Sequence, residues 1–364
     1  VQDYHNKKAR ERVHKAYREF LKKSQSLLEE GQFTELRDYI EEQSKGIRAQ
    51  DVSRAIATYT LSDLTQDLAG SKEGMKTGFS SLDKLITIPE EAITVIAGRP
   101  SHGKTTFLLN LLLNMVKLYQ DKAFFFFSYE ETKKQLALKV VNILSGVVVS
   151  EAQNLNALRY YLLGDNSRVD KEQGEAIETG KALFKEFTEN RRLWLIDEPY
   201  CIDELKSTLC YLAEKYTIGA VFVDYIQKIK TKGKYATRQL QVQDISATLL
   251  ELAKSLRLTA IVGAQLGRDK DRADKVRLDN LREAGDIEQD ANLVLGIYNE
   301  AMEKSEEQST KIAARVVELE ISILKNRNGL VNESVRLEFD RPILAVREKT
   351  LFPQATPTPN LKDW

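Results

Sequence analysis

Eight consecutive residues, Gly98–Thr105 with the sequence "GRPSHGKT", fit the pattern G-x-x-x-x-G-K-[ST]. They follow an apolar run typical of a buried strand and open an amphipathic run typical of a helix, which is the context that the pattern requires. Loop amides and a helix N-terminus direct N–H donors at a polyphosphate, while a lysine and a hydroxyl reach the terminal phosphates and Mg²⁺. We therefore predict that a nucleotide polyphosphate and Mg²⁺ are bound by Gly98, Ser101, Gly103, Lys104, Thr105 and Thr106, with Thr105 as a metal ligand.

A carboxylate at the end of a later apolar strand is expected to complete the metal site, and the sequence offers two. Asp197 ends "LWLID" and precedes Glu198, as in enzymes whose catalytic glutamate follows the metal aspartate. Asp224 ends "AVFVD", and with this choice the glutamate must come from elsewhere. Glu130, in "FFFFSYE", is then the candidate to orient and deprotonate the attacking water. The residue pattern alone leaves both aspartates open.

Two cations lie at alternate positions in "ILKNRNG", just before an Asn-Gly turn. Alternate residues of a strand project to the same side, so Lys325 and Arg327 are expected to leave the sheet together. One interpretation is a pair that reaches a phosphate. The other is a solvated strand edge whose cations deter aggregation.

Five continuous apolar runs, separated by amphipathic helical runs, must position these residues: "AITVIAG", "AFFFFS", "LWLID", "AVFVD" and "TAIVGAQ". This alternation predicts an α/β fold with a doubly wound, mostly parallel sheet that is buried on both faces. From about Glu318 the pattern changes and predicts a β-hairpin that finishes the sheet.

The whole sequence has 364 residues, 54 basic against 54 acidic side chains, and 42% hydrophobic residues, which predicts a large core and excludes a globally basic nucleic-acid binder. The cysteines Cys201 and Cys210 form neither a CxxC pair nor a disulfide framework, so we expect reduced thiols in a cytoplasmic protein. The apolar runs have the length of strands, and the charged N-terminus lacks the apolar core of a signal peptide. Because the sequence begins at Val1 rather than Met, we expect a fragment of a longer protein.

Composition divides the chain into four parts. Residues 1–60 are charged and helix-prone, and we predict a helical N-terminal appendage. Residues 61–77 contain the "LAGSKEGMKT" stretch, with two glycines, and are predicted to be a linker. Residues 78–349 are the predicted main domain, and residues 350–364, rich in proline and threonine, are a predicted flexible tail.

From about Gly78 to Phe339 the chain resembles the RecA-like motor domain of the hexameric DnaB-type replicative helicases, including phage and primase-helicase variants. The segments that carry the resemblance occur in the family's order: "TGFSSLD", "GRPSHGKT", "FSYE", "VDYIQ", "GAQLGR", "LDNLREAGDIEQDAN" and "KNRNG". The resemblance implies a P-loop NTPase fold, Asp224 as the metal residue and Glu130 as the catalytic residue. It also implies that Gln265 senses the γ-phosphate, and that Arg327 is an arginine finger with Lys325 as its partner, acting on a neighbouring subunit.

The resemblance further implies a homohexameric ATPase and helicase that translocates 5′ to 3′ on single-stranded DNA and opens forked duplex at the replication fork. In the family a loop of the "REAG" type follows the DNA backbone, which implies roles for Arg282, Glu283 and Gly285. A second basic stretch is a candidate pore loop, with Lys232 and Lys234 as cations and Tyr235 able to stack on a base; the alternative is a solvated loop.

The chain also departs from the family. His102 stands where a methionine is common, at a position that mainly shapes the turn. The first seventy or so residues do not resemble the N-terminal domain through which relatives engage primase, so primase and a helicase loader are candidate partners only. A RecA-like ATPase of recombination type and a ring that holds DNA without unwinding it are the rival functions. We expect no membrane contact.

Overall fold

The computed structural model describes residues 23–28, 30–40, 61–62, 65, 74–233, 235–266, 276, 287–308 and 314–349, without the side chains of 305–308. The chain divides into two compact units, residues 1–71 and 72–364. In the first unit the described helical residues are 23–28, 33–40, 61–62 and 65. The four parts expected from composition, residues 1–60, 61–77, 78–349 and 350–364, stay a prediction.

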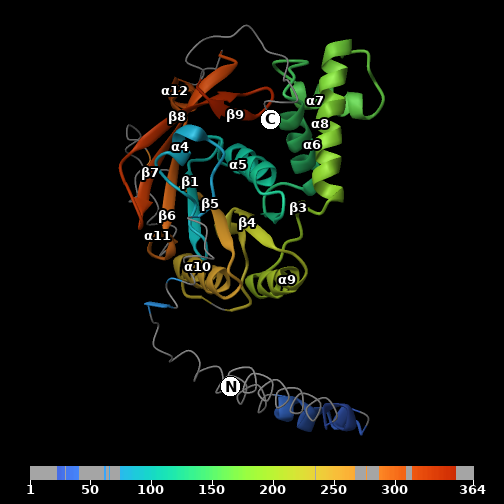
Figure 1. Ribbon diagram of the computed structural model, residues 1–364, viewed down its shortest axis with the longest axis vertical. Coiled ribbons are helices and arrows are strands. Elements are labelled where there is room, and N and C mark those ends of the chain that lie inside the picture. Colours follow the sequence, from blue (N-terminus) through green and yellow to red (C-terminus); the bar gives the residue numbers. More distant parts are fainter. Residues whose placement is uncertain are drawn as a thin grey trace. The chain divides into compact units, whose positions relative to one another are not determined.

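The second unit is built on one mixed sheet (Figure 1). Its described residues form nine strands in the order β3-β2-β4-β5-β1-β6-β7-β8-β9. The first six strands along the chain pair in parallel, and β7, β8 and β9 continue the sheet in antiparallel pairing. Their bounds are β1 Ile93–Gly98, β2 Ala123–Ser128, β3 Leu193–Ile196, β4 Ile218–Asp224, β5 Thr259–Gln265, β6 Leu293–Tyr298, β7 Val316–Asn326, β8 Ser334–Asp340 and β9 Ala345–Glu348.

Helices cover both faces of the parallel part of this sheet. Helices α5 and α6 pack on one face, and α9 and α10 pack on the other. The described helices are α4 Ser80–Asp83, α5 Lys104–Leu118, α6 Lys133–Ser145, α7 Asn154–Leu162, α8 Lys171–Glu189, α9 Ile202–Lys215, the 3₁₀ turn η1 Ile226–Lys228, α10 Arg238–Ser255, α11 Ile287–Asp290 and α12 Glu300–Gln308.

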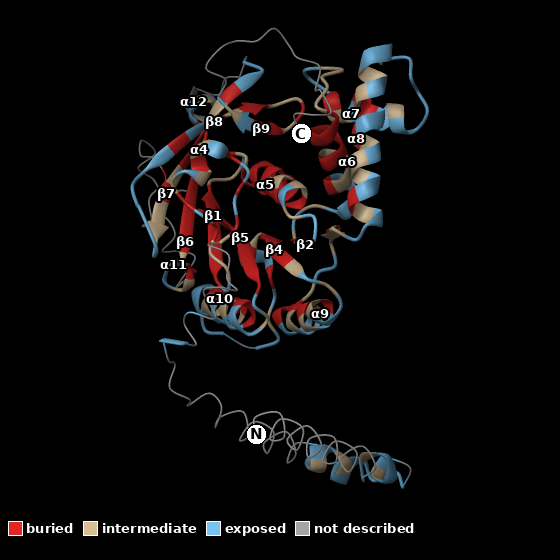
Figure 2. Ribbon diagram, in the orientation of Figure 1, coloured by how far each residue is buried: buried red, intermediate tan, exposed pale blue. Residues whose placement is uncertain are grey.

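Strand β2 shows why the apolar runs lack the alternation of a half-exposed strand. Phe124 and Phe126 pack into the core under α5 and α6, whereas Phe125 and Phe127 pack into the core under α9 and α10. Both sides of the strand therefore need large apolar side chains. Figure 2 shows the central strands as buried along almost their whole length. The predicted doubly wound, mostly parallel sheet is confirmed.

The C-terminal part of the sheet is larger than predicted. The expected hairpin is β7 and β8, but β9 adds a third antiparallel strand, and β6, which the sequence analysis did not anticipate, joins them to β1. Because β1 lies between β5 and β6, the phosphate-binding pattern that follows β1 lies at the centre of the sheet. In an open parallel sheet the carboxyl ends of the strands form the ligand-binding edge.

Candidate nucleotide-binding site

The phosphate-binding loop connects the end of β1 to the start of α5. Gly98 is the last residue of β1, and Gly103 is the N-cap of α5 with φ of 95°, a conformation that favours glycine. A Cβ placed on Gly103 would lie 3.9 Å from Cε1 of Phe339, so this aromatic ring borders the loop. The free N–H groups of the first turn of α5 are available for an anion at this position.

Lys104, Thr105 and Asp224 come together at this edge although 119 residues separate the threonine from the aspartate. The Thr105 hydroxyl donates a hydrogen bond of 2.6 Å to Asp224 Oδ2, and Lys104 Nζ lies 3.4 Å from Asp224 Oδ1. Lys104 Nζ also lies 4.0 Å from the centre of the Tyr225 ring. Thr106, the remaining predicted contact in α5, is buried behind the loop. The strand order thus assembles the predicted lysine, hydroxyl and carboxylate.

Burial controls the charge of Lys104. Desolvation lowers the pKa of its ammonium group, and the carboxylates of Asp224 and, more weakly, Glu130 act in the opposite direction. Asp224 is only 1% exposed, so a cation close to it is needed to stabilise its charge. The hydroxyl and carboxylate oxygens of Thr105 and Asp224 are ligands of the kind that Mg²⁺ prefers. These residues therefore fit a magnesium site.

The two acids that follow strand ends occupy different surroundings. Glu130 follows β2, is exposed, and acts electrostatically on Lys104 at the carboxyl edge. Asp197 follows β3 at the border of the sheet, where its Oδ2 accepts a hydrogen bond of 2.9 Å from the N–H of Lys133. Lys133 Nζ also forms ion pairs with Asp197 and Glu198. Asp197 thus contacts the first turn of α6, while Asp224 contacts the phosphate-binding loop.

Gln265 ends β5 directly beside Gly98, with which it pairs in the sheet. Its backbone is held by one side chain: Gln227 Nε2 donates to the Gln265 carbonyl at 2.9 Å, and Gln227 Oε1 accepts from the Gln265 N–H at 3.2 Å. The turn that follows Asp224 therefore fixes the end of β5. Gln265 thus lies beside the last residue of the strand that precedes the phosphate-binding loop, and its role as a sensor stays a prediction.

Gly263, in the middle of β5, was missed by the sequence analysis. A Cβ at this residue would lie 3.0 Å from Asp224 Oδ1 and 3.4 Å from Lys104 Cδ, so the glycine leaves room for their contact. The available signal was a glycine inside an otherwise apolar strand, which often marks a close approach of another group.

Lys325 and Arg327 lie away from the phosphate-binding loop of their own chain. Lys325 Nζ donates to the carbonyls of Glu288 and Gln289, and the Arg327 guanidinium donates to the Gln289 carbonyl. In the sheet Lys325 pairs with Val294, which is near the start of β6, whereas the end of β6 lies beside Gly98. Both cations thus contact backbone carbonyls of the same helix, α11, as expected for side chains that leave the sheet together. Figure 1 shows α11 near the start of β6 and the end of β7.

Most of the predicted DNA-binding residues lie in parts of the chain that the structure does not describe. Lys234, Arg282, Glu283 and Gly285 lie outside the described residues. Lys232 is exposed, which fits a pore-loop cation and a solvated loop equally. Tyr235 is also exposed, but its hydroxyl donates a hydrogen bond of 2.6 Å to Asp244, which holds one end of the ring.

Residues 74–347 match the model of a protein family described as "DnaB-like helicase C terminal domain". The chain belongs to this family. The match begins at the first described residue of the second unit and includes every strand of the sheet, apart from the last residue of β9. Within the described part of this family member, no helix is long and apolar enough to cross a membrane.

Curated relatives of this DnaB-like chain are replicative helicases. The replicative DNA helicase DnaB of Pasteurella multocida is 32% identical over 272 residues, which are 73% of this chain and 53% of that protein. The replicative DNA helicase DnaC of Bacillus subtilis is 28% identical over 289 residues, 78% of this chain and 58% of that protein. The chain therefore spans little more than half the length of these relatives.

Solved structures share the fold of this DnaB-like chain. A solved ATPase domain aligns with a TM-score of 0.64 at 20% identity, covering 80% of this chain and 97% of that one. A DnaB-like replicative helicase, described with its interactions with primase, aligns with a TM-score of 0.66 at 20% identity and covers 86% of this chain and 78% of that one. These alignments confirm the RecA-like architecture.

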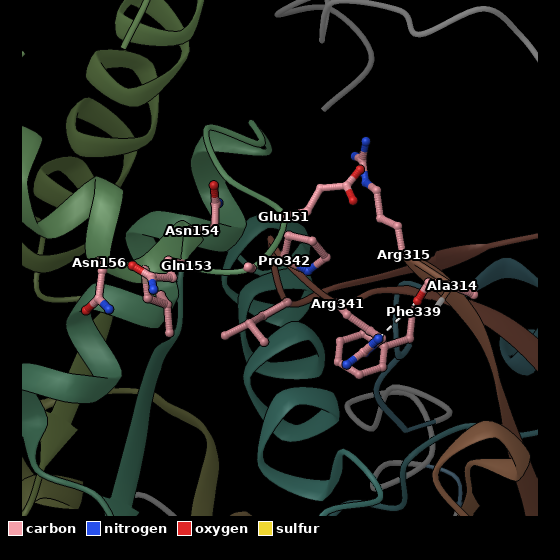
Figure 3. Close-up of a pocket in the computed structure, with 12 residues that line it drawn as sticks. Glu151, Gln153, Asn154, Asn156, Ala314, Arg315, Phe339, Arg341 and Pro342 are labelled. Atoms are coloured by element: carbon pink, nitrogen blue, oxygen red, sulfur yellow. Dashed lines mark hydrogen bonds between the residues drawn. The ribbon is translucent and has the colours of Figure 1, made fainter. Parts of the chain in front are cut away.

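A pocket of about 710 Å³ lies between the start of α7 and the C-terminal strands (Figure 3). Phe339, which borders the phosphate-binding loop, is part of its wall, together with Pro342 and Leu344. On the polar side, Arg315 forms two hydrogen bonds with Asp340, of 3.0 and 2.8 Å. The pocket shares Phe339 with the border of the phosphate-binding loop and combines apolar walls with polar groups, as small-molecule sites do.

Proposed function

We propose that this chain is the motor of an ATP- and Mg²⁺-dependent replicative DNA helicase, a homohexameric ring that translocates 5′ to 3′ on single-stranded DNA and opens the duplex at a replication fork in the cytoplasm. The observation that carries the proposal is the meeting of Lys104, Thr105 and Asp224 at the carboxyl edge of the sheet, beside the phosphate-binding loop. Membership of the DnaB-like family supports DNA as the polymer along which the motor moves.

Each residue of the site has a role in this proposal. The loop amides and Lys104 bind the phosphates, while Thr105 and Asp224 hold Mg²⁺, which neutralises phosphate charge when bound. Glu130 orients the attacking water and accepts its proton at the carboxylate. Gln265 reports the presence of the terminal phosphate, and the pocket beside Phe339 offers space for the nucleotide base.

Lys325 and Arg327 serve the nucleotide of a neighbouring subunit. Their contacts with α11, toward the amino end of β6, favour action between subunits rather than on their own phosphate-binding loop. A finger of this kind is worth about 10³ to 10⁵ in rate because it neutralises charge in the transition state. A ring uses this arrangement to report one subunit's nucleotide state to the next.

DNA and copies of the same chain are the proposed partners. Arg282, Glu283 and Gly285 in one loop, and Lys232 and Lys234 in another, are the proposed contacts with the DNA backbone. Such contacts bind without sequence preference. One structural neighbour is described with its interactions with primase; for this chain, primase and a loader are further candidate partners.

The proposal is tested by ATP-driven unwinding of two labelled forked duplexes, one with a free 5′ tail on the translocating strand and one with a 3′ tail. We expect only the 5′-tailed substrate to open. ATP turnover without opening of either substrate would favour a recombination-type ATPase or a ring that only holds DNA. Opening of the 3′-tailed substrate alone would contradict the proposed polarity.

A further inference from the structure

Glu303, in α12, is a buried carboxylate beside the phosphate-binding loop. Helix α12 follows β6, which brings its first turn next to this loop, since Ile297 of β6 pairs with Gly98. Glu303 Oε1 lies 2.5 Å from the Arg99 guanidinium, and its Oε2 lies 3.3 Å from His102 Nε2. Arg99 and His102 both belong to the loop, so one carboxylate contacts it at two points.

The orientation of His102 is fixed from its other side. The ring is completely buried, and its Nδ1 accepts a hydrogen bond of 3.3 Å from the backbone N–H of Asn299. An accepting nitrogen carries no proton, so a neutral ring places its proton on Nε2, which faces Glu303. Asn299 also caps α12, because its side-chain oxygen accepts from the Met302 N–H at 3.1 Å. The start of α12 therefore supplies both contacts to His102.

Between Arg99 and His102 the loop contains a strained residue. Ser101 has φ of 65°, in the left-handed region that a residue with a side chain adopts rarely. Such a conformation persists where the surroundings determine it. Glu303 contacts a residue on each side of Ser101 and thereby restrains the loop in the shape that directs its amides at a phosphate.

We propose that Glu303 is a positioning residue for nucleotide binding: through Arg99 and His102 it holds the phosphate-binding loop in its binding shape before the nucleotide arrives. The inference rests on the proposed nucleotide site. A loop that is ordered beforehand loses less conformational entropy when the ligand binds. Glu303 itself touches neither the nucleotide nor the attacking water, so its removal weakens binding but leaves Lys104, Glu130 and Asp224 to turn over the nucleotide that does bind.

The test compares Glu303→Ala and Glu303→Gln with a control, Glu300→Gln, in the full chain. Glu300 lies on the same helix, and its side chain is 61% exposed and paired with Lys304. The measurements are the Kd of a fluorescent ATP analogue, kcat and KM for ATP, and the melting temperature. We expect Glu303→Ala to raise Kd and KM about tenfold with kcat changed by less than about twofold, since the ion pair with Arg99 and the contact with His102 are lost.

The Glu303→Gln variant separates an effect on the position of the phosphate-binding loop from an effect on the stability of the fold. Its amide oxygen still accepts from Arg99, so we expect a smaller rise in Kd, about threefold, and no change for the control. An unchanged Kd in Glu303→Ala, or a fall in kcat with Kd unchanged, would overturn the inference. If the alanine variant does not fold, the Kd of the glutamine variant decides. A wild-type chain that binds no ATP analogue overturns the proposed function and this inference together, whereas normal wild-type binding with unaffected variants overturns the inference alone.

Discussion

The carboxyl edge of the parallel strands and the far end of β7 both present cations, but in different surroundings. At the carboxyl edge, Lys104 is buried against the carboxylate of Asp224, so charge is balanced within the chain. At the end of β7, Lys325 and Arg327 donate to backbone carbonyls of α11, and Arg327 is exposed. A carbonyl accepts a hydrogen bond without cancelling the charge. The first site is closed by a side-chain carboxylate of the same chain, whereas the second contacts the chain through backbone carbonyls, with the carboxylates of Glu288 and Asp290 acting on Lys325 electrostatically.

The largest effect is expected at the assembled site. Lys104→Ala removes the cation that faces both the phosphates and Asp224, so ATP turnover should fall below detection and ATP binding should weaken at least about tenfold. Steady-state ATPase and nucleotide titration measure this, with circular dichroism as the control for folding. Near-normal turnover would contradict the placement of the nucleotide.

Arg327→Ala tests the second region of the comparison, the end of β7. ATP binding should stay normal while turnover falls about 10³-fold, because a finger acts on charge that develops in the transition state. Mixing this variant with Glu130→Ala should restore part of the activity, since some mixed interfaces combine an intact Arg327 with an intact Glu130. Absence of rescue at every mixing ratio would count against action between subunits.

The two strand-end aspartates sharpen the definition of the first site. Asp224→Asn should lower turnover about 10²-fold and raise the Mg²⁺ concentration needed for half-maximal activity, because a carboxylate ligand is lost. Asp197→Asn is the matched control: it weakens the contact with Lys133 at the start of α6 and should leave the Mg²⁺ requirement unchanged. Equal effects of the two substitutions would contradict the assignment of the metal to Asp224.

Helix α5 carries a lysine at each end, Lys104 at its start and Lys117 near its end. Comparing the two tests whether burial of a lysine on this helix implies a function. Burial, and then repulsion by Arg347, lowers the pKa of Lys117 from 10.5 to about 8. Between these two values the unfolded chain binds more protons than the folded chain, so the free energy of unfolding should rise with pH. Below pH 8 Lys117 is charged in both the folded and the unfolded chain, so the full cost of burying its charge lowers the free energy of unfolding.

Lys117→Met should remove this penalty. We expect the variant to be more stable than the wild type at pH 7, by about 2 kcal/mol or less, and the difference should shrink as pH rises from about 8 toward 10.5. Urea unfolding at several pH values measures it. ATPase activity should not change, and a loss of activity would show that this end of α5 takes part in function.

The smallest effect is expected for Arg282→Ala, in the loop proposed to follow DNA. Binding of all DNA sequences should weaken to a similar, few-fold extent, and the slope of log affinity against log salt should fall by roughly one unit. Fluorescence anisotropy with several unrelated oligonucleotides measures both quantities. A loss that depends on sequence would contradict contact with the backbone.

Most of the fold could be predicted because its signals are local. The phenylalanine run of β2 and the apolar runs of β1, β4 and β5 indicate buried strands by themselves. Two strands were missed for local reasons as well. β6 contains Gly296, where a Cβ would lie 2.9 Å from Leu324 Cδ1, and a glycine weakens the pattern of a strand. β9 has only four residues, "AVRE", too few to show a pattern.

In the candidate site, residues that are contiguous in the sequence were predicted, whereas residues that join it through long-range contacts were not. The contiguous phosphate-binding loop was predicted in full, but the contribution of Glu303 was not, because it depends on a contact across 204 positions of the sequence. His102 was expected only to shape the turn; the structure adds a buried contact with Glu303. Gly263 carried a signal that gained meaning only once Asp224 and Lys104 were seen beside it.

The sequence by itself determined the phosphate-binding loop, the alternation of strands and helices, and the side to which Lys325 and Arg327 point, since each depends on neighbours a few residues away. The residue pattern left open which aspartate meets Thr105; the family resemblance implied Asp224, and the tertiary structure brings Asp224 to Thr105. Asp197 and Asp224 both end apolar strands, but β3 lies at the border of the sheet, while β4 is separated from β1 by β5 alone. The order of strands in a sheet is set by packing between distant segments, and no local pattern records it.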